Sequence, residues 1–187
     1  MFTRNYLLMI ILFLFGCSSP SKTRLTDDEL RWISIYKAGD TLVFKSSRGQ
    51  YDTIYITESK DYYPEFIPIE VHNEYLPHSG VVIYSHSSLH DSIVNERLVY
   101  IVKKNPEDRT QLFINLLNAK FISVDINTIK RISSGHELLY ELDTYHPKAN
   151  SGEPRMIYWK KDSGIVKYIT HDSEVWQIYK SNMTIGR

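Results

Sequence analysis

Short runs of β-branched and aromatic residues, separated by turn residues, recur about every 8–15 residues along most of this chain. The clearest pair is residues 41–45 and 51–57, with Gly49 in the loop between them. Apolar side chains alternate with other residues in both runs: Leu42 and Phe44 in the first, Ile54 and Ile56 in the second. Because successive side chains of a strand point to opposite faces, this alternation predicts two paired strands with one buried face.

The same reasoning predicts most of the remaining secondary structure. Further strands are expected at 80–85, 97–103, 120–124, 138–142, 156–160, 165–170 and 174–180. Residues 59–69 contain Pro64 and Pro68 and are not expected in a central strand. Short strands joined by short turns form antiparallel sheets rather than alternating strand–helix units. We therefore predict a mainly β (all-β) domain with an antiparallel, curved or half-barrel-like sheet.

One short helix is expected near the N-terminus, over residues 27–35. Thr26 is a good N-cap, and three acidic residues follow it in the first turn. Leu30, Ile33 and Trp32 supply an inward side for this helix. Segment 105–119 is ambiguous, because its leucines fit a helical face and also a strand over 111–117 paired with 97–103. We favour the strand.

The first residues of the chain have the pattern of a secretory signal. Arg4 precedes an uninterrupted apolar run over 6–15, which is about half the ~20 residues that a bilayer-spanning helix needs. The small residue Gly16 ends the segment, immediately before Cys17. Cys17 is the chain's single cysteine, so no intramolecular disulfide can form.

The ending Leu14-Phe15-Gly16-Cys17 resembles the lipobox of bacterial lipoproteins. This resemblance implies that residues 1–16 are a signal peptide and that Cys17 carries acyl chains that anchor the protein to a membrane. Residues 17–25 would be the lipidated cysteine and a flexible tether, and 26–187 a single domain. Ser18, in place of an aspartate, implies the outer membrane in the best-known sorting scheme. Two or three acyl chains suffice for stable anchoring.

A wider resemblance covers about a third of the chain, at its two ends. Residues 32–40 and 52–54 look like the opening of small uncharacterised bacterial lipoproteins, and residues 157–168 and 174–176 look like their final hairpin and strand. The resemblance implies a β fold and a location in the cell envelope. It implies no catalytic residue.

The charge balance excludes one class of partner. The chain has 22 basic and 22 acidic residues, and Arg4 is the one charged residue among the first sixteen. A protein without a basic surplus has no electrostatic footprint for nucleic acid. We expect membrane lipid as a partner through acylated Cys17, and a protein or glycan of the envelope as a further partner.

Residues 62–69 are the most interesting candidate binding loop. Tyr62, Tyr63 and Phe66, if exposed, would stack on a sugar or insert into a partner groove or a membrane. The alternative is a loop that folds back over the core of the sheet, and we favour this alternative.

Signals for catalysis, metals and cofactors are weak. His86 and His90 would share one face of a strand, with His72 or His78 as a third ligand, but nothing indicates that they converge, so no metal or other cofactor is expected. No Gly-x-Ser-x-Gly motif is present, as a serine hydrolase would favour. Residues 40–42, 52–54 and 91–93 each resemble a bacterial O-glycosylation sequon.

The sequence is therefore compatible with three functions. The first, which we favour, is a lipid-anchored accessory protein that binds a partner or glycan without catalysis. The second is a lipid or lipoprotein carrier whose curved sheet surrounds an apolar pocket. The third, with the least support, is an envelope hydrolase.

Overall fold

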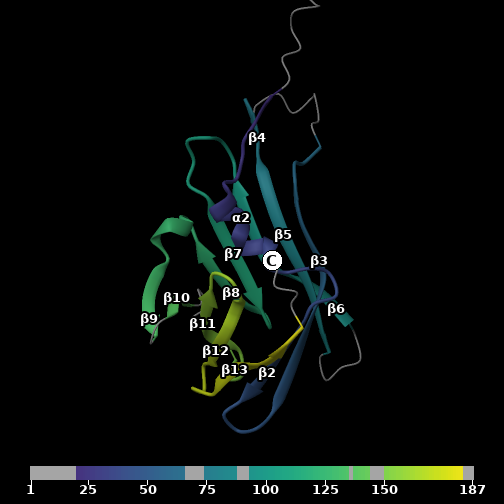
Figure 1. The fold of residues 1–187 in the computed structure, drawn as a ribbon, viewed down its shortest axis with the longest axis vertical. Helices are drawn as coiled ribbons and strands as arrows, with labels where there is room; N and C mark the ends of the chain where they lie inside the picture. The colour runs from purple at the N-terminus through teal and green to yellow at the C-terminus, as the bar shows by residue number, and fades with distance from the viewer. Residues whose placement is uncertain (1–19, 66–73, 88–92, 135–136, 144–149, 183–187) are drawn as a thin grey trace, which may run out of the picture.

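A computed structural model describes residues 20–65, 74–87, 93–134, 137–143 and 150–182 (Figure 1). One α-helix, α2 (Asp27–Ser34), and one 3₁₀ turn, η1 (Ile126–Thr128), accompany the strands. The strands are β1 (Ser21–Lys22), β2 (Thr41–Ser46), β3 (Tyr51–Tyr62), β4 (Tyr75–Leu76), β5 (His78–Ser87), β6 (Ile93–Lys103), β7 (Gln111–Leu116), β8 (Ala119–Ser123), β9 (Lys130–Ser134), β10 (Glu137–Asp143), β11 (Pro154–Lys160), β12 (Gly164–Thr170) and β13 (Val175–Ser181).

Eleven of these strands form one antiparallel sheet in the order β8-β7-β6-β5-β3-β2-β13-β12-β11-β10-β9. The last strand, β13, pairs with the first long strand, β2, so that Leu42 faces Ser181. The two edge strands, β8 and β9, are consecutive in the chain and are linked through η1. The sheet is thus a half-barrel, as predicted, and we call the gap between β8 and β9 the seam.

The concave face of the half-barrel holds the core. Leu42, Phe44, Ile54 and Ile56 are at most 1% exposed, so the predicted inward faces of β2 and β3 are correct. Helix α2 packs against β3, β5 and β6, and Trp32 contacts rings on β10 and β11. Figure 1 accordingly shows α2 between the two arms of the curved sheet.

The residues predicted to begin the helix form its N-terminal cap. The Thr26 hydroxyl accepts a hydrogen bond from the Glu29 N–H, and the Glu29 carboxylate accepts one from the Thr26 N–H. This reciprocal capping box satisfies two N–H groups that the first turn of a helix would otherwise leave unpaired. Trp32 and Ile33 are buried, which confirms the predicted inward side.

Two further predictions on strands have opposite outcomes. Within the ambiguous segment, residues 111–116 form β7 and pair with β6, which confirms the strand interpretation. In contrast, residues 59–62, which we excluded from a central strand, continue β3 and pair with β5. Pro64 lies just beyond the strand, so it ends β3 without breaking a ladder hydrogen bond. Strand β9 was not predicted, because its sequence Lys-Arg-Ile-Ser-Ser has little apolar character.

The second half of the predicted tether is bound to the domain. Ser21 and Lys22 form β1, which pairs in parallel with β4. Thr23 and Leu25 are buried, and the Leu25 N–H donates to His78 Nδ1 at 2.9 Å. The flexible part of the expected 17–25 tether can therefore extend no further than Pro20.

Candidate ligand-binding site

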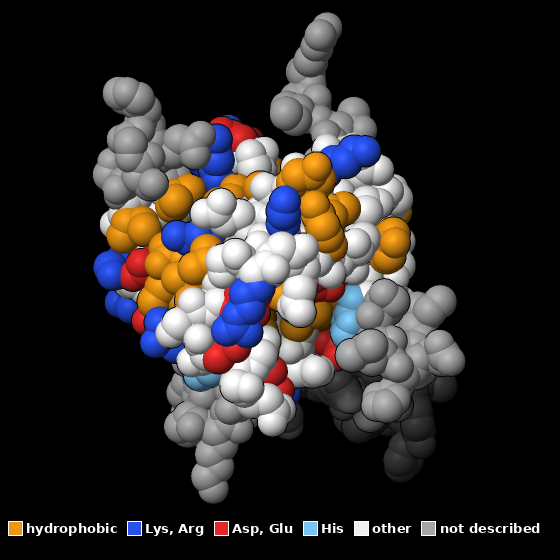
Figure 2. All heavy atoms as spheres, turned by 90° about the horizontal axis from the view of Figure 1, so that it is seen from below, with side chains coloured by type: hydrophobic (Ala, Val, Ile, Leu, Met, Phe, Trp, Pro, Cys, Tyr) orange, Lys and Arg blue, Asp and Glu red, His pale blue; other side chains and the backbone are white. Residues whose placement is uncertain are grey.

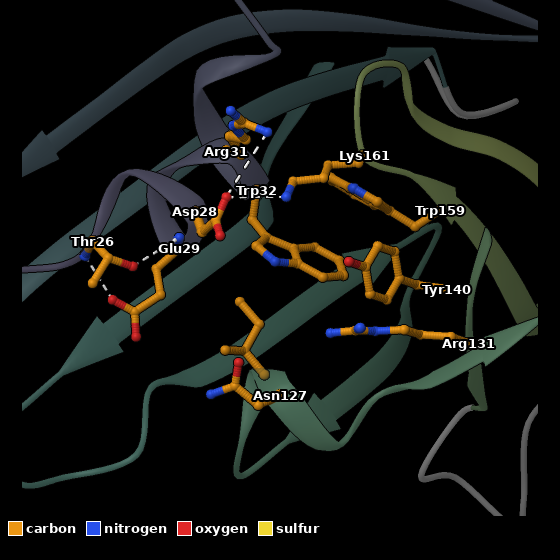
Figure 3. Close-up of a pocket in the computed structure, with 11 residues that line it drawn as sticks. Thr26, Asp28, Glu29, Arg31, Trp32, Asn127, Arg131, Tyr140, Trp159 and Lys161 are labelled. Carbon is orange, nitrogen blue, oxygen red and sulfur yellow. Dashed lines mark hydrogen bonds and ion pairs between the residues drawn. The ribbon is translucent and has the colours of Figure 1, made fainter. Parts of the chain in front are cut away.

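A pocket of about 290 Å³ opens at the seam, beside α2 (Figure 3). Its walls come from four parts of the chain: α2 with its N-cap, η1, the neighbouring strands β9 to β11, and the turn after β11. The pocket lies on the β9 side of the seam, where η1 and α2 pack beside this edge strand.

Aromatic rings form the floor of this pocket. The Trp32 ring centroid lies 5.1 Å from that of Tyr140 and 4.9 Å from that of Trp159. Behind them, the Tyr36 ring meets Trp159 edge-on at 5.6 Å. Trp32 and Trp159 are almost fully buried, whereas Tyr140 is half-buried and borders the opening. These contacts hold the floor rigid, because each ring is packed on at least one other.

Three cationic side chains surround the aromatic floor. Lys161 Nζ lies 3.0 Å from the Asp28 carboxylate, and Arg31 lies 3.8 Å from the same group. The hydrogen bond and positive charge of Lys161 hold the pKa of Asp28 below its usual value. Arg131 lies over the Tyr140 ring, 5.5 Å from its centroid, and no carboxylate among the described residues pairs with it. The rim thus carries three positive charges against the one of Asp28.

The second carboxylate near the pocket, Glu29, is occupied elsewhere. Its oxygens accept hydrogen bonds from the Thr110 hydroxyl and the Thr26 N–H, and Lys103 Nζ lies 3.9 Å away. Burial by itself raises the pKa of Glu29, but these hydrogen bonds and the charge of Lys103 outweigh it, so the pKa is lowered. Glu29 therefore stays ionised and fixes α2 to the sheet. It does not neutralise the rim.

This arrangement is suited to binding an anion that carries a ring. The half-buried Tyr140 ring offers an apolar surface at the opening, and a guanidinium over a tyrosine ring presents N–H donors that fit a carboxylate or phosphate. Figure 3 shows the Arg131 side chain extending below Tyr140 toward the space between Trp32 and Asn127. The lining residues include no histidine, serine or cysteine that would act as a nucleophile.

The binding residues predicted from sequence lie elsewhere. Tyr62 borders a separate groove at the start of β4, together with Pro64 and Tyr75. Tyr63 stacks on His78, with ring centroids 4.6 Å apart, and its hydroxyl donates to the Thr23 carbonyl at 2.9 Å. Tyr63 therefore clamps the N-terminal segment onto the sheet. Cys17 and Phe66 lie outside the described residues.

The histidines that suggested a metal site have other partners. The Leu25 N–H donates to His78 Nδ1, so the proton of the neutral ring is on Nε2, which donates to Asp61 at 2.9 Å. His86 stacks on Tyr84, with ring centroids 5.7 Å apart. His72 and His90 lie outside the described residues, within which no three potential metal ligands come together.

A second polar cluster lies inside the half-barrel, toward the end of the sheet away from β4. The Tyr168 hydroxyl donates to the Asp52 carboxylate at 3.2 Å, and the Tyr84 hydroxyl donates to Glu96 at 3.1 Å. Burial raises the pKa of Asp52, and burial together with the nearby carboxylates raises the pKa of both tyrosines. The tyrosines therefore remain protonated donors that satisfy the carboxylates. This cluster stabilises the interior.

The pocket residues were missed by sequence reasoning as a group. Trp32 and Trp159 were assigned to a helix and a strand, and Arg131 was in no predicted element. More than 100 residues separate the helix from β10 and β11 in the chain, and no local pattern links them.

No protein-family model, no curated protein and no solved structure matches this chain. Among the described residues, no helix has the length and apolar character needed to cross a membrane.

Proposed function

We propose that this protein is a lipid-anchored, non-catalytic binding protein of the bacterial outer membrane, and that the pocket at the seam binds an anionic sugar of the cell envelope. The lipobox-like ending at Cys17 supports the anchor and the location. The observation that carries the ligand class is Arg131, whose guanidinium lies over the Tyr140 ring at the pocket and meets no carboxylate among the side chains that the structure describes.

The choice of an anionic ligand follows from the charge of the rim. Asp28 is shared between Lys161 and Arg31, so these two cations are incompletely neutralised, and Arg131 pairs with no carboxylate among the described side chains. A charge-assisted hydrogen bond contributes about 1.5–3 kcal/mol, more than a neutral one. An uncharged sugar would lose this contribution and keep the contact with the aromatic rings.

The carrier alternative has less support than the binding module. A carrier needs an apolar cavity of several hundred Å³ open to an acyl chain. The concave face is instead occupied by α2 and by fully buried side chains from both arms, among them Leu98, Leu112, Ile157 and Ile165. The 290 Å³ pocket at the seam has a charged rim, which suits a sugar acid or phosphate better than a hydrocarbon chain.

Binding to charged and uncharged sugars tests this proposal. Digalacturonate and glucose 6-phosphate would be titrated into the full-length protein, with galactobiose and glucose as uncharged counterparts. Trp32 and Trp159 line the pocket, so tryptophan fluorescence would report binding. We expect at least one anionic sugar to bind about tenfold or more tightly than its counterpart, in line with one charge-assisted hydrogen bond.

Arg131→Gln provides the residue-level test. It should weaken anionic-sugar binding about tenfold or more, because the guanidinium that would donate to the ligand anion is removed. Arg155→Gln on β11 is the matched control, since Arg155 is exposed and does not line the pocket. Equal loss in both variants, or no difference between charged and uncharged sugars, would contradict the proposed site.

A further inference from the structure

The distance between the lipid anchor and the folded domain is very short. The Ser21 N–H donates to the Glu74 carbonyl at 3.0 Å, and the Thr23 N–H donates to the Leu76 carbonyl at 2.9 Å. The domain is therefore fixed from Ser21 onward, and only residues 18–20 separate it from Cys17. Even fully extended, the four Cα–Cα steps from Cys17 to Ser21 span at most about 14 Å.

The end of the barrel at which this segment emerges presents a mixed amphipathic surface. It is formed where β3 and β6 end and β4 and β5 begin, at the top of Figure 1. Tyr62, Pro64, Tyr75, Pro77 and Lys104 line a shallow groove there. The side chains of Lys22 and Arg24 are exposed beside it. We call this surface the anchor face.

We propose that the anchor face rests on the phospholipid headgroups of the membrane, held there by the short link to acylated Cys17. The proposal rests on the lipid anchor of the proposed function. The bilayer is the surface that contacts the anchor face, because a link of about 14 Å leaves the domain no room to turn another end toward the membrane.

The chemistry of the anchor face is compatible with a headgroup layer. Tyrosine rings have an apolar body and a polar hydroxyl, and they are enriched at membrane–water interfaces. Lys22, Arg24 and Lys104 are accompanied by Asp61 and Glu74, which are also exposed. Because the charges are mixed, the contact should not depend on anionic lipid. The covalent anchor, and not electrostatic attraction, determines the orientation.

The opposite end of the domain would then face away from the bilayer. It contains the β2–β3 hairpin loop. This loop lies at the other end of β3 from Tyr62, about 36 Å away at 3.3 Å per residue. Figure 2, seen from this end, shows hydrophobic, basic and acidic side chains interspersed over the surface.

Headgroup quenching tests this orientation with the full-length, lipidated protein. Cys17 is the single cysteine, so acylation leaves any introduced cysteine as the one free thiol for a fluorophore. One label is placed at Lys104→Cys on the anchor face, and the matched control at Gln50→Cys in the β2–β3 loop. The probe is a phosphatidylcholine vesicle that contains nitroxide-headgroup lipid.

We expect several-fold stronger quenching at position 104 than at position 50, and the same ratio when phosphatidylglycerol is added to the vesicles. A variant with twelve Gly/Ser residues inserted between Ser18 and Ser19 should lose most of this difference. Equal quenching at the two positions of a protein that is acylated and vesicle-bound would overturn the orientation alone. Quenching at 104 that persists with the long tether would overturn the role of the short link. Absence of the acyl mass at Cys17 would overturn the anchor and the orientation together.

Discussion

At the residue scale, one glycine allows the helix to lie on the sheet. Gly80 on β5 faces α2, and a Cβ at this position would overlap the Ile33 side chain and lie 2.9 Å from Ile101 Cγ2. Both isoleucines are buried in the core. The close approach of α2 to β5 therefore depends on the absence of a side chain at position 80.

Gly80→Ala should reduce the free energy of unfolding by about 1–3 kcal/mol, because the added methyl group forces a shift of Ile33 or of the helix. Urea unfolding followed by tryptophan fluorescence measures the change. Gly152→Ala is the matched control, since a Cβ there meets nothing within 4 Å. An unchanged urea midpoint for Gly80→Ala would show that α2 does not pack as described.

A second prediction at this scale concerns the pH dependence of stability. Burial raises the pKa of Asp52 above its ordinary value of 3.8, although the Tyr168 hydroxyl partly offsets this. A carboxyl with a raised pKa in the folded state favours folding while it is protonated, and this contribution is lost as the pH rises above about 4 through the folded-state pKa.

Asp52→Asn should therefore be more stable than the unmodified protein at pH 7, and the difference should shrink as the pH falls toward 4. The asparagine carbonyl can still accept from Tyr168, so the variant removes the charge and keeps the hydrogen bond. Urea midpoints at several pH values measure the difference. A difference that is independent of pH would contradict the raised pKa.

At the scale of elements, α2 contributes to both the core and the pocket. It has only 8 residues, fewer than an isolated helix needs to be stable in water. Its stability must come from packing and from its N-terminal cap.

The two edge strands of the seam carry exposed lysines, Lys120 on β8 and Lys130 on β9. Charged side chains on an edge strand oppose pairing with another chain.

Thr26→Ala removes the cap oxygen and should lower the free energy of unfolding by about 0.5–2 kcal/mol. Thr26→Ser keeps the oxygen and should stay close to the unmodified protein. Thermal unfolding of the three proteins under the same conditions compares them. If serine and alanine destabilise equally, the capping box does not contribute to stability.

At the scale of the whole molecule, the fold is an up-and-down meander that returns to its beginning. Every neighbouring pair in the large sheet is antiparallel, and the pairing of β2 with β13 joins strands about 130 residues apart in the chain. Contacts of such long separation are slow to form, because the entropy of closing the loop must be lost before they contribute any stabilisation. The same topology leaves β8 and β9 unpaired with each other, which creates the seam, and the pocket lies on its β9 side.

Local sequence patterns determined most of the strands of this protein and the helix α2. Alternating apolar residues predicted β2 and β3, runs of β-branched and aromatic residues predicted β11 and β12, and Thr26 with the acids after it predicted α2, since these signals act between residues at most a few positions apart. The antiparallel sheet followed from the spacing of the strands. The lipid anchor at Cys17 was also a local motif, and it remains a prediction.

Only the tertiary structure decided where those elements meet. Trp32, Tyr140 and Trp159 form one floor because the sheet curves back on itself. Tyr63 was predicted as a candidate ligand contact. Its hydroxyl instead donates to the Thr23 carbonyl, because the N-terminal segment lies along the sheet beside β4. β9 is a strand despite its polar sequence because β10 offers it a row of hydrogen-bonding partners. Each of these depends on contacts between residues that are distant in the chain, which no local pattern encodes.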